Sequence, residues 1–178
     1  MDRPSNLLGA LALAVVDRTT EAVAGAAGHS LSAAAALSAL QHIVEAPSIV
    51  RLSQILGLTH SGTVRLVDRL EQEGSVRRQR GVDGRSAAVS LTSAGREAAA
   101  RLTRARGEVL ETVLAPLAPE EREVLGDLVG RLLVGMMRDP GAIRWTCRLC
   151  DTGACGRYTG GCPIGRAAQA RFSSSGPG

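Results

Sequence analysis

The sequence contains no lysine, and all 21 of its basic side chains are arginines, a bias that by itself indicates no function. It also has no uncharged apolar stretch of about 18 residues, the length that a membrane-spanning helix needs. The first residues, Met1 to Pro4, lack the basic region and apolar run of a secretory leader. These absences favour a cytoplasmic protein with no membrane partner.

Aromatic and catalytic side chains are also scarce. The only aromatic residues are Trp145, Tyr158 and Phe172, so a body formed by the earlier residues must have an aliphatic core. The three histidines are scattered and lack carboxylate partners that would suit a catalytic centre. We therefore expect that the protein is not an enzyme, and that His29 and His42 have ordinary structural positions.

The length and charge of the chain set further limits. Its 178 residues are enough for one domain with a hydrophobic core plus an extension. A formal net charge of +4 is too small to establish a nucleic-acid partner by itself. The positive charge is concentrated, however, because residues 51–96 carry eight arginines and four carboxylates.

Two short helices are predicted in this basic region. Residues 49–56 place apolar side chains on one helical face, and Gly57 then ends the helix. Thr59 or Ser61 can cap the next helix, which Gly74 closes. In that second helix the inward residues are Val64, Val67 and Leu70, and the outward ones are His60, Ser61, Thr63, Arg65, Asp68 and Arg69. Short polar side chains followed by arginines suit a helix that enters a major groove.

A hairpin follows the second helix. Residues 76–80 and 87–91 read as strands, and residues 81–86 form a turn with two glycines and an aspartate. Two helices, a hairpin and a further helix make a winged helix-turn-helix, in a fold that is mainly α (α+β). We expect a domain over residues 1–140, with its DNA-binding core at 31–96, and a separate tail over 141–178.

Around the hairpin the sequence resembles the MarR family of bacterial transcription regulators. The resemblance lies in Asp83-Gly84-Arg85, in residues 89–96 (VSLTSAGR) and in residues 66–74 (LVDRLEQEG), and it covers about residues 5–140. It implies that Arg85 enters a minor groove while Asp83 orients the guanidinium of Arg85. The expected DNA-binding residues are His60, Ser61, Thr63, Arg65, Arg69, Arg78, Arg80, Asp83 and Arg85.

The remaining helices are expected to form a dimerisation stem. We predict helices over about residues 4–27, 31–44, 93–114 and from Pro119 to just before Pro140. The first helix is apolar on more than one side, and the last has a stripe made of Leu125, Leu128, Val129, Leu132, Leu133 and Met136. The resemblance implies that the first and last helices interlock two protomers, which matches a pseudo-palindromic operator. The alternative is ordinary core packing within one chain.

All four cysteines lie in the tail, at Cys147, Cys150, Cys155 and Cys162, with the spacing C-x2-C-x4-C-x6-C. A glycine-rich segment this short cannot bury a hydrophobic core, and it stays disordered unless a cross-link holds it together. In a reducing compartment such thiols indicate metal ligands or redox centres more than structural disulfides. Metal binding by all four would fold the tail.

The identity of the metal stays open. Zinc sites commonly use two tight cysteine pairs, and Cys155 and Cys162 are too far apart to form the second. The loose spacing and the proline after Cys162 are typical of iron–sulfur loops. The layout also resembles the cysteine loop of SoxR-type regulators, although the spacings differ. We expect a [2Fe-2S] cluster ahead of Zn²⁺, and redox-active thiols without metal after both.

The resulting hypothesis is a homodimeric regulator that binds a duplex operator in the bacterial cytoplasm and senses redox or metal state through the four thiols. We expect it to be a repressor. Loss of the metal centre would loosen the tail against the first and last helices and change their crossing. A small-molecule effector is a further expected partner. The alternatives are a constitutive regulator whose zinc tail is structural or recruits a partner, and a thiol oxidoreductase that uses Cys147 and Cys150.

Overall fold

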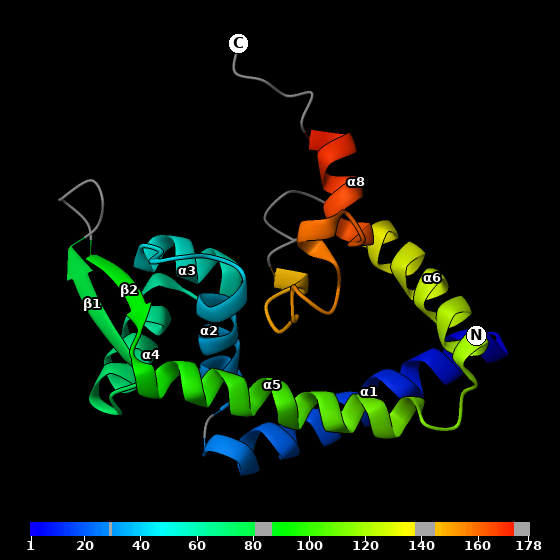
Figure 1. The fold of residues 1–178 in the computed structure, drawn as a ribbon, viewed down its shortest axis with the longest axis horizontal. Coiled ribbons are helices and arrows are strands. Elements are labelled where there is room, and N and C mark those ends of the chain that lie inside the picture. Colours follow the sequence, from blue (N-terminus) through cyan, green and yellow to red (C-terminus); the bar gives the residue numbers. More distant parts are fainter. Residues whose placement is uncertain (29, 81–86, 138–144, 173–178) are drawn as a thin grey trace.

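The computed structural model describes residues 1–28, 30–80, 87–137 and 145–172. This part of the chain is mainly helical and contains one two-stranded antiparallel sheet (Figure 1). The elements are α1 (Arg3–Ala27), α2 (Leu31–His42), α3 (Ile49–Leu56), α4 (His60–Gln72), β1 (Val76–Arg80), β2 (Ala87–Leu91), α5 (Ser93–Leu114), α6 (Pro119–Gly135), the 3-10 helix η1 (Arg157–Thr159) and α8 (Pro163–Phe172).

Local capping explains where the helices begin and end. The side chains of Ser48 and Thr59 accept backbone N–H bonds at the starts of α3 and α4. Gly57 ends α3 with a φ of 63°, in the left-handed region that glycine tolerates. Thr92 caps α5 in the same way as Thr59 caps α4. The predicted bounds of α3, β1, β2 and α5 are therefore confirmed.

The winged-helix lobe, by which we mean α2, α3, α4, β1, β2 and the start of α5, contains the main hydrophobic core. That core is aliphatic, as predicted, and its most deeply buried side chains include Leu37, Leu52, Leu70, Val67 and Val89. The strands pair from Val76 opposite Leu91 to Arg80 opposite Ala87. The backbone N–H of Val89 also donates to the carbonyl oxygen of Pro47, which ties the wing to the segment before α3.

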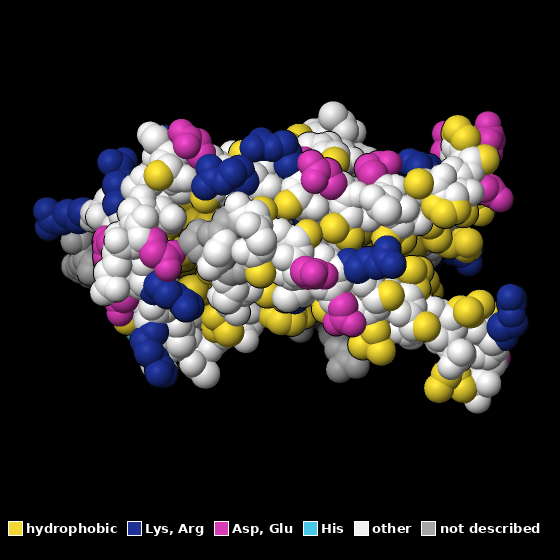
Figure 2. Space-filling view, turned by 90° about the horizontal axis from the view of Figure 1, so that it is seen from below, with side chains coloured by type: hydrophobic (Ala, Val, Ile, Leu, Met, Phe, Trp, Pro, Cys, Tyr) yellow, Lys and Arg dark blue, Asp and Glu magenta, His cyan; other side chains and the backbone are white. Residues whose placement is uncertain are grey.

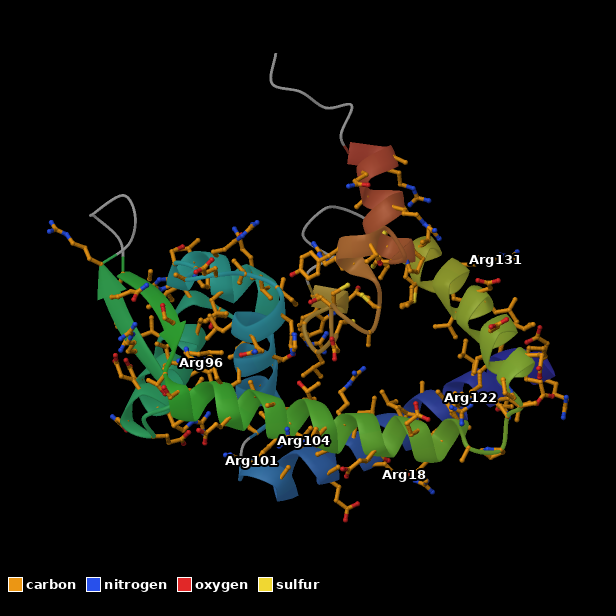
Figure 3. All side chains as sticks on the ribbon, viewed as in Figure 1. Arg18, Arg96, Arg101, Arg104, Arg122 and Arg131 are labelled. Carbon is orange, nitrogen blue, oxygen red and sulfur yellow. The ribbon has the colours of Figure 1, made fainter. Side chains whose placement is uncertain are left out.

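Two long helices extend from this lobe. Helix α1 runs alongside α5, and the end of α5 leads through a turn into α6 (Figure 1). Arg122 on α6 pairs with Glu111 on α5 at 2.9 Å, which fixes the junction of these helices (Figure 3). No single helix in the described ranges is long and apolar enough to cross a membrane; α1 and α2 reach that length and composition only as a pair bent by 79°.

The cysteine tail is more structured than the sequence indicated. It contains η1 and α8, and α8 packs against α6 (Figure 1). A second, small hydrophobic cluster joins Cys147, Cys162 and Ile164 of the tail to Met137 at the end of α6. The expected boundary near residue 140 lies outside the described residues, and the tail packs on the rest of the chain.

Candidate nucleic-acid interface and thiol cluster

Helix α4 presents a polar face at its N-terminal end. His60, Ser61, Arg65 and Arg69 are all exposed, as predicted. The Oγ1 of Thr59 accepts the backbone N–H of Gly62 at 3.1 Å, so the first turn of α4 is held in place by its own cap. A rigid first turn with exposed donors is the geometry that a major groove requires of an inserted helix.

The prediction that Thr63 faces outward, where it would contact DNA, is wrong. Thr63 is 0% exposed and its Oγ1 donates to the carbonyl oxygen of Thr59 at 3.0 Å. The inward face of α4 consists of Thr63, Leu66, Val67 and Leu70, and Val64 is only half-buried. A threonine can occupy this core because its hydroxyl is satisfied by the preceding turn.

Arg78 joins the wing to α4. Its guanidinium donates to Asp68 at 2.5 Å and also to Glu71, while its backbone N–H donates to Glu71 at 2.8 Å. The hydrogen bond from the backbone of Arg78 is the largest cause that lowers the pKa of Glu71. The carboxylate of Asp68 is the largest cause that raises the pKa of Arg78. These bonds fix the angle between β1 and α4, a positioning role that the sequence did not reveal.

The other predicted wing residues fall into two groups. Arg80 is exposed at the end of β1, beside the hairpin tip. Asp83 and Arg85 lie outside the described residues, so their expected contact with a minor groove stays a prediction.

Gly95 positions the wing on α5, and sequence reasoning gave it no role. A Cβ at this position would lie 1.8 Å from the carbonyl oxygen of Ser75, so only glycine allows α5 to approach the backbone just before β1 this closely. Thr92 adds a hydrogen bond from its Oγ1 to the carbonyl oxygen of Gly74 at 2.6 Å. The sequence signal for this role is the spacing of Leu91, Thr92 and Gly95, in which a capping threonine and then a glycine follow the end of β2.

The helices of the predicted dimerisation stem expose apolar side chains. On α1 these are Leu7, Leu8, Leu11, Leu13 and Val16, and on α6 they are Val124, Leu128, Val129, Leu132 and Met136. The alternative of core packing within one chain is therefore wrong for most of the α6 stripe. Figure 2 shows hydrophobic side chains gathered toward the end of the molecule where α1 begins and α6 lies, whereas arginines are spread along the whole face.

The four cysteines come together in the tail as free thiols. The thiols of Cys147 and Cys150 interact as one pair, and those of Cys155 and Cys162 interact as another. Cys147 and Cys162 are buried, and the other two are half-buried. We call this group of four the thiol cluster. Cys162 also begins α8, where its Sγ accepts the backbone N–H of Gly165 at 3.3 Å.

The pKa values of the thiols differ because their neighbouring groups differ. The pKa of Cys150 is lowered to about 6, chiefly by the side chain of Cys147 and also by the cations of Arg106 and Arg157, which together outweigh the burial of this thiol. The interaction with Cys150 raises the pKa of Cys147, and burial raises the pKa of Cys155. Arg106 belongs to α5 and was not expected near the thiols. Arg148, which follows Cys147 in sequence, instead lies over Trp145.

The thiol cluster fits a metal centre by its chemistry more than by its present geometry. Four soft thiol donors beside two arginines are a suitable set for zinc or an iron–sulfur cluster. As placed, however, no three histidine, cysteine or acidic side chains in the described segments are grouped closely enough to hold a metal ion. Small side-chain movements within the two pairs would be needed to form such a site.

Comparison with known proteins agrees with the fold. Neither a protein-family model nor a curated protein matches the sequence. A MarR family protein from Bacillus stearothermophilus has 24% identity and a TM-score of 0.68, over 78% of this chain and 99% of its own. A probable transcriptional regulator from Pseudomonas aeruginosa has 28% identity and a TM-score of 0.57, over 73% and 99%.

A third solved structure, a MarR family transcriptional regulator from Silicibacter pomeroyi, has 25% identity and a TM-score of 0.59 over 73% of this chain and 90% of its own. The match covers 90–99% of each of these three structures. The chain therefore has the winged-helix fold of the MarR family of transcription regulators.

Proposed function

We propose that the protein is a transcription regulator, not an enzyme, that binds duplex DNA through α4 and the wing. The observation that carries this proposal is the exposed face of α4, where His60, Ser61, Arg65 and Arg69 stand on a helix whose buried face is fixed in the lobe core. The names of the similar structures support the same role. Base contacts would come from the first turns of α4, and Arg80 would contact phosphates.

The regulator is proposed to act as a homodimer. An α6 stripe left exposed in the single chain is too apolar for a solvated helix, and α1 exposes a second apolar face at the same end of the molecule. A second copy of this chain would cover both faces with a two-fold axis, so that two copies of α4 meet two half-sites of a pseudo-palindromic operator.

The thiol cluster is proposed to be the sensor. Cys147, Cys150, Cys155 and Cys162 would hold the metal centre, with a [2Fe-2S] cluster expected ahead of Zn²⁺. Such a centre would supply one-electron redox chemistry if it contains iron, and only structural cross-linking if it contains zinc. A groove of about 390 Å³ between the end of α2 and the wing, lined by Glu45, Arg77 and Arg96 among others, would suit a small anionic effector.

DNA binding is tested by selecting duplexes from a randomised pool. The enriched duplexes should contain inverted repeats with half-site centres about one helical turn apart. The double variant Arg65→Ala and Arg69→Ala should weaken binding to the selected duplex and lower its salt dependence. Arg104→Ala, an exposed arginine further along α5, is the matched control (Figure 3). Absence of any enriched sequence would contradict the proposal, and enrichment of single half-sites would contradict the dimer.

The sensor is tested by metal analysis and the visible spectrum of anaerobically purified protein. A chromophore lost in the Cys147→Ser and Cys155→Ser double variant supports an iron–sulfur centre, and one colourless zinc per chain supports the structural alternative. If the double variant binds the selected duplex as wild type does in every redox state, the tail is not a sensor of DNA binding.

A further inference from the structure

The cysteine tail touches the turn of the helix-turn-helix. If Gly57 had a Cβ, that atom would lie 2.7 Å from Cε3 and 2.8 Å from Cζ3 of Trp145. The six-membered part of the indole therefore packs directly on the backbone between α3 and α4. Gly57 is restricted to glycine here for two reasons, because its φ of 63° and the ring contact both exclude a side chain.

Trp145 is held in this position by its own segment. The guanidinium carbon of Arg148 lies 3.4 Å from the centroid of the Trp145 ring, and Arg148 Nη1 donates to the Trp145 carbonyl oxygen at 2.7 Å. Burial lowers the pKa of Arg148, which agrees with a guanidinium packed against the ring. The indole is nonetheless 44% exposed, so it is free to move if its support changes.

The same short segment carries two of the four thiols. Leu149 packs against the lobe core, whereas Cys147 and Cys150 belong to the thiol cluster. The backbone N–H of Cys150 donates to the carbonyl oxygen of Cys147 at 2.8 Å, so these residues form one tight turn. One side of the turn therefore contacts the lobe, and the other side contacts the thiols.

A second attachment lies at the end of α2. Thr152 Oγ1 and Tyr158 Oη both donate to the carbonyl oxygen of His42, at 3.1 and 3.2 Å. Cys155 lies between these two residues and belongs to the opposite thiol pair. Both halves of the thiol cluster are thus linked to the lobe through immediate neighbours in sequence.

We infer that residues 145–149 form a clamp, in which Trp145 holds the turn between α3 and α4 and the chemical state of the thiol cluster sets the position of Trp145. A change in the thiol pairs must move the tight turn that links Cys147 to Cys150, and the indole and Leu149 move with it. Because α4 begins directly after the clamped turn, the displacement reaches the recognition helix within a single subunit.

This route differs from the mechanism expected from the sequence, in which the tail acts on the first and last helices. In the described residues the tail packs on α6 and on the lobe, and Figure 1 shows α8 well apart from α1. The clamp needs no change in the crossing of dimer helices. Its effect on DNA affinity rests on the proposed function, but the movement of Trp145 does not.

Fluorescence measures the movement directly, since Trp145 is the only tryptophan in the chain. We expect its emission to shift when the reduced protein binds Zn²⁺ or when its thiols are alkylated with N-ethylmaleimide. The variant with serine at all four cysteine positions should show neither shift. An emission spectrum that responds to neither treatment in wild type would overturn the clamp, whether or not the protein binds DNA.

The effect on DNA binding is measured with Trp145→Ala. For wild type we expect zinc loading or alkylation to change the affinity for the selected duplex about tenfold, a usual size for coupling between two sites. In Trp145→Ala, with its thiols intact, the same treatments should change the affinity less than about twofold. If the affinity of this variant changes as strongly as that of wild type, the inferred clamp is wrong, and the proposed function as a transcription regulator is unaffected.

Gly57→Ala should reproduce the loss of coupling, because the new methyl group displaces the indole. Its control is Gly28→Ala, since Gly28 also ends a helix with a positive φ, of 64°, but has no atom within 4 Å of the position a Cβ would take. Both variants carry the same kind of backbone strain, and only Gly57→Ala should uncouple the thiols from DNA binding. Equal coupling in the two variants would show that the ring contact is irrelevant.

Discussion

The winged-helix lobe buries its own core, whereas the cysteine tail is buried only against other parts of the chain. Leu37, Leu52 and Leu70 are almost completely enclosed by neighbouring elements of the lobe. Among the described residues of the tail the buried aliphatic side chain is Ile164, which packs with two cysteines and with Met137, just after α6. The lobe is therefore stable by burial, and the tail depends on its docking and on its thiols. This difference suits the proposed function, in which the lobe binds DNA and the thiols of the tail act as a sensor.

The largest change in stability is expected at Gly95, where the lobe has no space for an additional atom. Gly95→Ala would place a Cβ 1.8 Å from the carbonyl oxygen of Ser75, and neither backbone segment can move without disturbing the wing. We expect a loss of about 3 kcal/mol in the free energy of unfolding, measured by urea titration with circular dichroism.

Gly107→Ala is the control in the same helix. A Cβ at Gly107 would meet nothing within 4 Å, so alanine should stabilise α5 by about 0.5–1 kcal/mol through helix propensity. Equal effects of the two substitutions would show that α5 does not pack on β1 as described.

A pair of core truncations separates the two regions. Leu52→Ala should lower the stability of the lobe by about 3 kcal/mol. Ile164→Ala removes a side chain that is 3% exposed, yet it should leave the unfolding midpoint of the lobe almost unchanged and increase proteolysis within residues 145–172. If Ile164→Ala lowered the midpoint as much as Leu52→Ala, the tail and the lobe would be one cooperative unit.

The lobe could be predicted from sequence because its signals are local. Ser48, Thr59 and Thr92 each cap a helix through a backbone N–H a few residues away, and Gly57 ends α3 by its own conformation. The error at Thr63 came from treating a polar side chain as an outward one, although its hydroxyl is satisfied by the turn before it.

The tail and the wing contacts could not be predicted in the same way, because they join residues far apart in sequence. Nothing near Trp145 indicates that it packs on Gly57, and nothing near Arg106 places it beside Cys150. Helix α8 was missed because its start relies on Cys162, which accepts the N–H of Gly165 in a capping role that sequence patterns assign to serine or aspartate. Four cysteines indicated a site, and only the fold showed what the site touches.

A smaller, pH-dependent effect is expected at the junction of α4 and the wing. The pKa of Glu71 lies below its ordinary 4.5, chiefly because the backbone N–H of Arg78 bonds to the carboxylate. The stability gained from this carboxylate is therefore complete above about pH 4.5 and is lost as the pH falls through the lower pKa of the folded state.

Glu71→Gln tests this expectation, because glutamine keeps the shape of the side chain and removes its charge. Its melting temperature should lie below that of wild type at pH 7, and the two should converge as the pH falls through the lowered pKa of Glu71. A difference that persists unchanged at acid pH would mean that the charge of Glu71 does not hold the wing.

The smallest effect is expected where α8 meets α6. A Cβ on Gly130 would lie 3.2 Å from Cγ of Pro163, a contact that α8 can relieve by moving a few tenths of an ångström. The gain in helix propensity and the tighter contact should nearly cancel, leaving a net change below about 1 kcal/mol in stability.

Alkylation of Cys162 is a more sensitive measurement than unfolding, because this thiol is buried at the start of α8 and becomes accessible only when α8 shifts. The alkylation rate should rise in Gly130→Ala and stay at the wild-type value in Gly126→Ala, where a Cβ would meet nothing within 4 Å. A rate that rises equally in both would place the cause in α6 itself, and the tail would then be less firmly docked than its contacts with α6 indicate.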